Sequence, residues 1–421
     1  MEKLSNEGVP VAITTAGLRG SHWREERLPA DVKVVPKSLI TEDGAQVTGF
    51  LFYRGGEKTV VCAMHPREML VTQYLVPEIL SGGCAVWVMG SRNAGNDLRL
   101  EHEKALLDLA AGQRHLLELG YEHRVLVGTS GGGPLAAYYV QQAGRPTEQR
   151  VARSPGGKPT GLQAAEMPLP DGVILVSSHL GQGTLLMKCI DPSVVDENDP
   201  MQTDERYSIF NPDNGFCPPP QSSSYRPDFL AHYRVAQRER VARIDSVARK
   251  LIEQRLEAKK RFRSTQSYSD AAMAAYSPIF TVWRTDADPR CFDLSLEPSN
   301  RAYGSLWGAH PFNSNFGSVG FGRVCTPESW LSNWSGISSN ASMEKCAPSL
   351  QMPVLMVVYD GDNSVFPSEA QQLFDLIGSD DKTRRIVAGN HHGKPVRPGQ
   401  PDGQAETGAH IREWLGNKNF V

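Results

Sequence analysis

The stretch that decides the fold is Arg124–Gly133, RVLVGTSGGG, which continues into PLAAYY at residues 134–139. Its apolar first half predicts a buried strand, and the segment after the glycines predicts a helix. Between them lies the pattern G-x-S-x-G, in which Gly128 and Gly132 stand two residues on either side of Ser130. A strand-to-helix turn this tight strains the backbone of the serine and leaves no room for side chains at those two positions. The sequence therefore predicts that the Ser130 hydroxyl stands above a sheet, at the N-terminus of a helix.

The composition of the chain is that of an ordinary globular protein. Its 421 residues are 40% hydrophobic and 22% charged, which is enough for one large α/β core and a substantial insertion. The net charge of −3 argues against the basic surface that nucleic acid or an anionic membrane requires. Seven scattered cysteines without a C-x-x-C pattern are typical of a reduced protein. The N-terminus has no apolar leader and no apolar run reaches 18 residues, so we expect a soluble, cytoplasmic protein.

Upstream of the serine, strand and helix patterns alternate. Asp43-Gly44 predicts the turn of a β-hairpin. It is preceded by a short strand at 32–35 that Pro36 interrupts, which suggests a sheet edge or a bulge. Such alternation predicts right-handed crossovers and a mostly parallel sheet with helices on both faces. The predicted segments are strands at 59–63, 85–89 and 172–176 and helices at 69–80 and 101–119.

Beyond residue 176 the alternation stops, and it resumes only near residue 353. The intervening region is irregular apart from one long charged helix pattern at 228–263. Where the alternation resumes, the predicted segments are strands at 353–359 and 384–388 and helices at 368–377 and 408–416. We therefore predict an N-terminal arm at 1–31, an α/β core at 32–190 and 350–421, and a mainly helical insertion at 191–349.

A serine in this position becomes a nucleophile only with a base and with an acid that orients the base. In an open parallel sheet, such groups lie at the carboxyl ends of strands. The predicted strand 353–359 ends in Asp360-Gly361-Asp362. Asp362 is preferred as the acid because it lies in the turn past the strand end. Asp360 lies closer to the strand and suits the turn itself.

The last predicted strand ends in Gly389-Asn390-His391-His392-Gly393, which supplies the base. The order Ser, Asp, His is the one associated with this serine turn. Adjacent side chains point in different directions, so only one of the two histidines can meet the serine. We prefer His392, because Gly-x-x-His followed by a small residue lets the loop dip toward the serine, and His391 is the alternative.

Two N–H groups are expected to bind the oxyanion, one from Gly131 and one from the loop that begins at His65. That loop reads His65-Pro66-Arg67, and proline has no N–H, so Arg67 is the candidate backbone donor. The Arg67 guanidinium could also contact a substrate carboxylate, and the alternative is an arginine that lies in solvent. His65 and His179 are candidate substrate contacts, and the alternative for His179 is an ordinary loop residue. The histidines lack H-x-x-x-H and H-E-x-x-H spacings, so we expect no metal site.

The serine turn, the acidic turn and the terminal histidine, in this order, resemble the α/β-hydrolase superfamily. The resemblance covers about residues 32–190 and 350–421 and implies that the region between them is a lid inserted after the sixth strand. It also implies nucleophile, acid and base roles for Ser130, Asp362 and His392. Two features depart from the family: the usual His-Gly of the oxyanion loop is His-Pro here, and the lid is larger than most.

The expected function is that of a serine hydrolase cleaving a carboxylic ester of a small apolar or aromatic molecule through an acyl-enzyme. C–C bond hydrolases, lactonases and thioesterases use the same groups and remain alternatives, as does a non-catalytic binding protein on this fold. We expect no cofactor and a small-molecule substrate as partner. The charged helix 228–263 could cover the site or pack on a second subunit. Aromatic residues that could line the pocket, though core packing is the commoner role, are Tyr225, Phe229, Tyr233, Trp283, Trp307, Phe312, Phe316, Phe321, Trp330 and Trp334.

Overall fold

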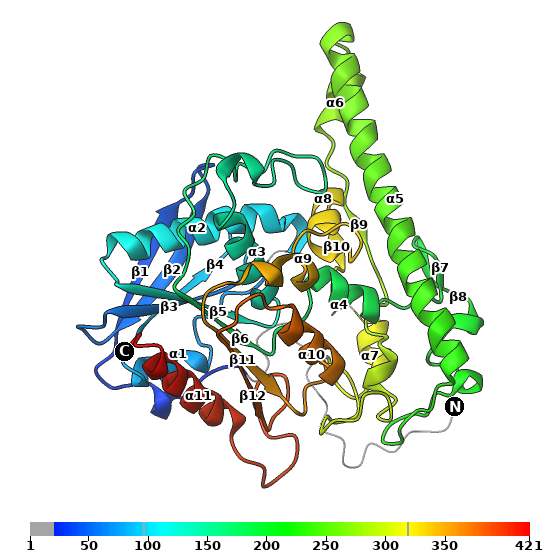
Figure 1. Cartoon of the computed structure of the whole chain (residues 1–421). Helices are drawn as coiled ribbons and strands as arrows, with labels where there is room; N and C mark the ends of the chain where they lie inside the picture. The colour runs from blue at the N-terminus through cyan, green and yellow to red at the C-terminus, as the bar shows by residue number, and fades with distance from the viewer. Residues whose placement is uncertain (1–20, 96, 318–319) are drawn as a thin grey trace.

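The structure is a computed structural model that describes residues 21–95, 97–317 and 320–421. A central sheet is formed by β1 (Lys33–Ile40), β2 (Gln46–Tyr53), β3 (Thr59–His65), β4 (Ala85–Gly90), β5 (His123–Thr129), β6 (Gly172–Val176), β11 (Val354–Tyr359) and β12 (Lys382–Val387). The strand order is β1-β2-β4-β3-β5-β6-β11-β12 (Figure 1). β2 runs antiparallel to both neighbours, and every other neighbouring pair in this sheet is parallel.

Helices cover both faces of the sheet, as predicted. Alternate residues of a strand point to opposite faces, so Leu126 packs in one core cluster while Val125 and Val127 pack in the other. The first face is covered by α2 (His102–Glu118), α3 (Gly132–Ala143) and α10 (Pro367–Leu376), and the second by α1 (Leu75–Ser81) and α11 (Gly403–Asn417).

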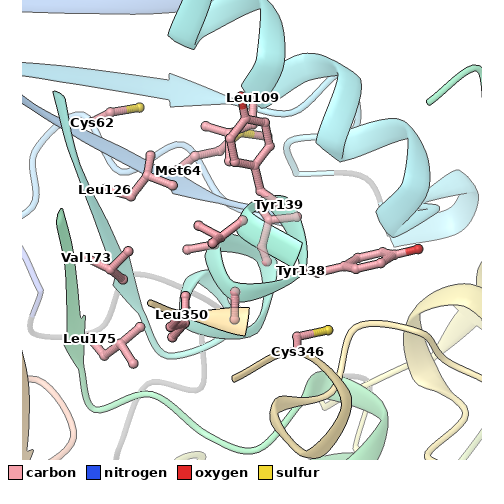
Figure 2. Packing of buried hydrophobic residues seen from close by; sticks show 14 of the residues in the cluster. Cys62, Met64, Leu109, Leu126, Tyr138, Tyr139, Val173, Leu175, Cys346 and Leu350 are labelled. Carbon is pink, nitrogen blue, oxygen red and sulfur yellow. The ribbon is translucent and has the colours of Figure 1, made fainter. Parts of the chain in front are cut away.

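The first face carries the larger core cluster. Figure 2 shows Leu126, Val173 and Leu175 pointing from the strands toward α3, which carries Tyr138 and Tyr139. All five side chains are almost completely buried. Because α3 follows directly from the serine turn, this packing fixes the N-terminus of α3 above the sheet.

Several predicted boundaries are corrected by the structure. β1 continues through Pro36 without interruption, because β1 is the edge strand and proline needs no ladder partner on its open side. The helix expected from residue 69 begins only at Leu75, and the residues before it run across the strand ends, where Gln73 donates to Thr129 Oγ1 at 3.0 Å. The last helix begins at Gly403 rather than at residue 408, because the Asp402 carboxylate caps it. Of the predicted arm 1–31, residues 1–20 lie outside the described residues.

A mostly helical insertion follows the sixth strand, β6, as predicted. Its division from the core at residues 190 and 350 stays a prediction. After α4 (Gln182–Cys189), the helices of the insertion are α5 (Pro227–Thr265), α6 (Tyr268–Ala275), α7 (Pro311–Asn315), α8 (Pro327–Ser329) and α9 (Met343–Cys346), and its short strands are β7 (Val194–Asp196), β8 (Asp199–Thr203), β9 (Phe280–Thr281) and β10 (Val324–Cys325). A π-helical turn lies at Trp330–Trp334. Turns of 3₁₀ helix lie at Glu25–Arg27, Asp97–Arg99, Thr147–Gln149, Glu205–Tyr207, Pro212–Asn214, Pro289–Cys291 and Ala347–Ser349.

A buried ion pair holds the start of the insertion to its middle. The Asp191 carboxylate is fully buried and lies 2.7 Å from the Arg284 guanidinium. It also accepts hydrogen bonds from Asn315 Nδ2 at 2.9 Å and from Ser193 Oγ at 2.6 Å. Arg284 has a positive φ of 57°. This network gives a structural role to the region around Asp191, and it joins segments far apart in the sequence.

The helix α5 is longer than predicted and extends beyond the body of the molecule, with α6 folded back against its end (Figure 1). The two helices are joined at Gln266, which has a left-handed backbone with φ 50°. No residue of α6 is buried. In the described part of the chain, no helix is both long and apolar enough to span a membrane.

Candidate active site

The turn at Ser130 has the geometry that the sequence predicts. Ser130 lies between β5 and α3 with a φ of 50°, and its N–H donates to the Val176 carbonyl at 3.1 Å. A Cβ on Gly128 would lie 2.6 Å from the Gly132 carbonyl oxygen, and a Cβ on Gly132 would lie 2.7 Å from that of Met64. Both positions therefore require glycine, and the serine side chain projects at the carboxyl end of the sheet.

His391, and not His392, faces the serine. His391 Nε2 lies 3.1 Å from Ser130 Oγ, and its Nδ1 lies 2.9 Å from Asp362 Oδ2. The preference for His392 was wrong because the loop after β12 is held differently. The Asn390 side chain accepts the N–H of His392 at 2.9 Å, and Gln404 donates to the His392 carbonyl at 2.8 Å. This arrangement brings the first histidine of the pair over the serine.

Asp362 lies in the turn after β11, where the sequence predicts it, and it is 1% exposed. It accepts hydrogen bonds from Ser177 Oγ and from the Ser364 N–H, each at 2.7 Å. Burial, the largest effect, raises the pKa of this carboxyl, but the attraction of His391 and the hydrogen bonds outweigh burial and hold the pKa below its ordinary value. Asp360 instead accepts from the Gly389 N–H, which is the turn role expected of it.

Of the two predicted oxyanion donors, the N–H of Gly131 is free to bind an oxyanion and the N–H of Arg67 is not. Gly131 stands at the N-terminus of α3, and its N–H has no acceptor among the described residues. The Arg67 N–H, by contrast, donates to His65 Nδ1 at 3.2 Å. The Arg67 guanidinium pairs with Asp97 at 2.6 Å and lies 4.9 Å from the Trp334 ring centre. Arg67 is thus a structural residue here, because both its backbone and its side chain have partners within the protein.

His65 and His179 both lie at the site and share one local geometry. Each is buried, and each accepts a hydrogen bond at Nδ1 from the N–H two residues later, Arg67 for His65 and Gly181 for His179 at 3.2 Å. Burial lowers the pKa of His65 well below its ordinary value and lowers the pKa of His179 to about 3, with nearby positive groups adding to both effects. Both imidazoles are therefore neutral near pH 7, with the proton on Nε2.

A cavity of about 70 Å³ lies beside Ser130 and is bordered by both histidines. Two of the ten aromatic candidates, Trp307 and Phe321, line it, and Leu306 adds to this apolar side. Burial raises the pKa of Glu68, which also borders the cavity. The lining residues that sequence reasoning missed are Ser21, Glu68, Leu70, Gln73, Tyr74, Thr129, Val176, Ser177, Gln182 and Leu306.

Of the missed residues, Ser177 had a usable signal. It directly follows β6 at the carboxyl end of the sheet, and the same rule had identified Asp362. Gln182 opens the helix α4 after Gly181, a position that does not stand out in the sequence. Within the described ranges, no cluster of three or more His, Cys, Asp or Glu side chains could hold a metal ion.

No family model and no curated protein matches the sequence. Solved structures that are similar include a complex of DcsB with its substrate analogue, at 13% identity over 91% of this chain and 99% of that one, with a TM-score of 0.48. The hypothetical protein PA2218 from Pseudomonas aeruginosa is 13% identical over 94% and 99% of the two chains, with a TM-score of 0.47. The esterase Est22 is 13% identical over 94% and 84%, with a TM-score of 0.44.

The chain has the α/β-hydrolase fold. Three features define this fold: the strand order of the central sheet, the antiparallel strand β2 within it, and the strained serine between β5 and α3. These solved structures are only 13% identical to the chain, so the role of each residue is argued from the geometry of the site itself.

Proposed function

We propose that the protein is a serine hydrolase that cleaves carboxylic esters through an acyl-enzyme. The observation that carries this proposal is the hydrogen-bonded series Ser130–His391–Asp362, with contacts of 3.1 and 2.9 Å, beside a cavity. The three residues come from three strand ends, and no structural requirement places a strained serine between glycines at this point. Nucleophile, base and orienting acid are the groups that acyl transfer needs.

In this mechanism, His391 Nε2 accepts the proton of Ser130 as Oγ attacks the ester carbonyl. Asp362 accepts the Nδ1–H of His391 and stabilises the imidazolium that forms. His391 then returns the proton to the leaving alcohol, and a water molecule activated by the same histidine hydrolyses the acyl-enzyme. The Gly131 N–H, at the positive end of α3, binds the oxyanion of each tetrahedral intermediate.

The size of the cavity supports a short acyl group. For comparison, an enclosed apolar cavity of about 150 Å³ binds benzene, whereas this one measures about 70 Å³. We therefore narrow the expected apolar or aromatic substrate to an ester whose acyl part is small. Leu306, Trp307 and Phe321 form the apolar side of the cavity, and they are placed to contact the hydrocarbon part of the ester.

The test is hydrolysis of p-nitrophenyl acetate, butyrate and benzoate by the wild type and by Ser130→Ala. We expect the acetate to be the best substrate and Ser130→Ala to lose at least about 10³-fold in kcat. Ser130→Ala should also lose labelling by a fluorophosphonate probe, which marks activated serines. A folded wild type that neither hydrolyses nor labels would favour the non-catalytic binding protein. Lactone, thioester and β-diketone substrates, assayed beside the esters, separate the alternative bond types.

A further inference from the structure

Neither of the first two residues after β3 offers a free N–H to the oxyanion. Pro66 carries no N–H, and the Arg67 N–H is directed to His65 Nδ1. One donor alone, from Gly131, would leave the developing negative charge with one of the two hydrogen bonds that an oxyanion hole supplies. A second donor from a side chain at the same place would remove this deficit.

The contact from Arg67 decides which nitrogen of His65 carries the proton. Because Nδ1 accepts a hydrogen bond, the neutral ring must have its hydrogen on Nε2. His65 is only 6% exposed, and burial keeps its pKa low, so the ring does not take up a second proton near pH 7. His65 Nε2–H has no acceptor among the described residues although the ring is buried.

The Nε2 atom of His65 is positioned over the residue that follows the nucleophile. It lies 2.9 Å from the point where a Cβ on Gly131 would stand, and Gln182 Nε2 lies 2.8 Å from the same point. A side chain at position 131 would therefore separate these groups from the serine turn, and glycine leaves the approach open. His65, Gln182 and Ser130 all border the same cavity.

We propose that the Nε2–H of His65 is the second hydrogen-bond donor to the oxyanion, in place of a backbone N–H. This assignment rests on the ester hydrolysis proposed above. His65 keeps its proton throughout: it donates a hydrogen bond to the negative oxygen, while the proton transfers belong to His391. The His-Pro departure from the family pattern is then explained, because the donor moves from the backbone of the loop to the side chain that begins the loop.

Two substitutions separate this role from a structural one. In His65→Asn, the amide oxygen can replace Nδ1 as acceptor for the Arg67 N–H, as in an Asx turn, but the shorter side chain does not reach the position of Nε2. In His65→Gln, the longer amide can reach the position of Nε2 with an N–H. We expect His65→Asn to lose about 10²–10³-fold in kcat with KM within about threefold. His65→Gln should recover at least about tenfold of that loss.

A folded His65→Asn that keeps kcat within about threefold of the wild type would overturn the assignment, while Ser130-dependent hydrolysis by the wild type would leave the hydrolase proposal standing. A wild type without activity or labelling would instead refute the hydrolase, and the His65 role with it.

A measurement on the wild type covers the case in which neither variant folds. In the protein phosphonylated at Ser130, the proton NMR signal of His65 Nε2–H should move downfield and exchange slowly, because it donates to the phosphonyl oxygen. The signals of the histidine rings are distinguished by coupling to ¹⁵N. An unchanged signal would also overturn the proposal.

Discussion

Ser177 donates a hydrogen bond from Oγ to Asp362 Oδ2 at 2.7 Å, and it does so from a strained backbone with φ 45°. The hydroxyl meets the same oxygen that contacts His391 Nδ1. Ser177 therefore orients the acid of the proposed triad from a neighbouring strand end, and its positive φ is maintained despite the cost to a non-glycine residue.

Removal of the Ser177 hydroxyl tests this positioning role. Ser177→Ala and Ser177→Gly should each lower kcat by about 10- to 150-fold, because a hydrogen bond to a charged group contributes about 1.5–3 kcal/mol. Glycine tolerates the positive φ, so Ser177→Gly separates the loss of the hydroxyl from backbone strain. The control is Ser178→Ala, since Ser178 Oγ has no hydrogen-bond partner among the described residues. Equal rates for all three variants and the wild type would contradict the role.

The two adjacent histidines should differ sharply on substitution. His391→Ala removes the group that contacts both Ser130 and Asp362, so we expect a loss of at least about 10³-fold in kcat. His392→Asn leaves those contacts in place and should keep activity within about tenfold. Steady-state kinetics on p-nitrophenyl acetate measure both. The reverse order of effects would restore the sequence-based preference for His392.

The buried pair in the insertion should dominate its stability. Asp191→Asn leaves Arg284 buried without a counter-charge, which costs about 3–5 kcal/mol. Urea unfolding followed by circular dichroism measures the change. Asp204→Asn is the matched control, because it breaks an Asp–Arg pair whose arginine, Arg206, is exposed, and it should change stability little. If the two variants unfolded alike, the buried network would not be a major support of the insertion.

Stability should fall on mild acidification because of buried histidines. Burial, the largest effect, lowers the pKa of His102 to about 4, although a hydrogen bond to the Ser332 carbonyl opposes it. Between about pH 6.5, the value for an unfolded histidine, and about pH 4, the unfolded state binds the proton and the folded state does not. The free energy of unfolding therefore decreases as the pH falls through this window, by up to about 1.4 kcal/mol per pH unit for His102. His65 and His179 act in the same direction.

His102→Asn should flatten this pH dependence by about that slope. Unfolding free energies at pH 8, where the imidazoles are neutral in both states, give the packing cost of the substitution separately. The difference between pH 8 and pH 5 then reports the titration alone. A variant with the wild-type slope would show that His102 takes up its proton in the folded protein.

The sequence alone predicts the features that follow from strand ends and from steric exclusion, namely the position of Ser130, the position of Asp362 and the doubly wound sheet. Ser130 could be located because only glycine fits at Gly128 and Gly132, a property that a short stretch expresses completely. Asp362 could be located because the carboxyl ends of parallel strands meet at one edge of the sheet. The doubly wound sheet followed from the alternation of apolar runs, since each crossover is constrained to one hand.

The rest of the site could not be predicted, because it depends on contacts between residues that no local sequence pattern reveals. The choice between His391 and His392 is made by Asn390 and by Gln404 on the following helix, which hold the loop. The acceptor of the Arg67 N–H depends on the rotamer of His65, because that rotamer places Nδ1 near the N–H. The sequence does not specify this rotamer. The cavity beside Ser130 is bordered by Trp307 and Phe321, which lie at the edge of an apolar cluster of the insertion. Other aromatic candidates are buried within the clusters of the insertion, namely Tyr225, Phe229, Tyr233, Trp330 and Trp334.

The end of the projecting helices α5 and α6 is a suitable point for attaching a label to the protein. The turn at Gln266 lies at the far end of this hairpin, away from the central sheet that carries Ser130 (Figure 1). Because α6 buries none of its residues, a peptide inserted at this turn disturbs little packing. An affinity tag or fluorophore attached there would tether the protein to a sensor surface through a segment that lies outside the central sheet.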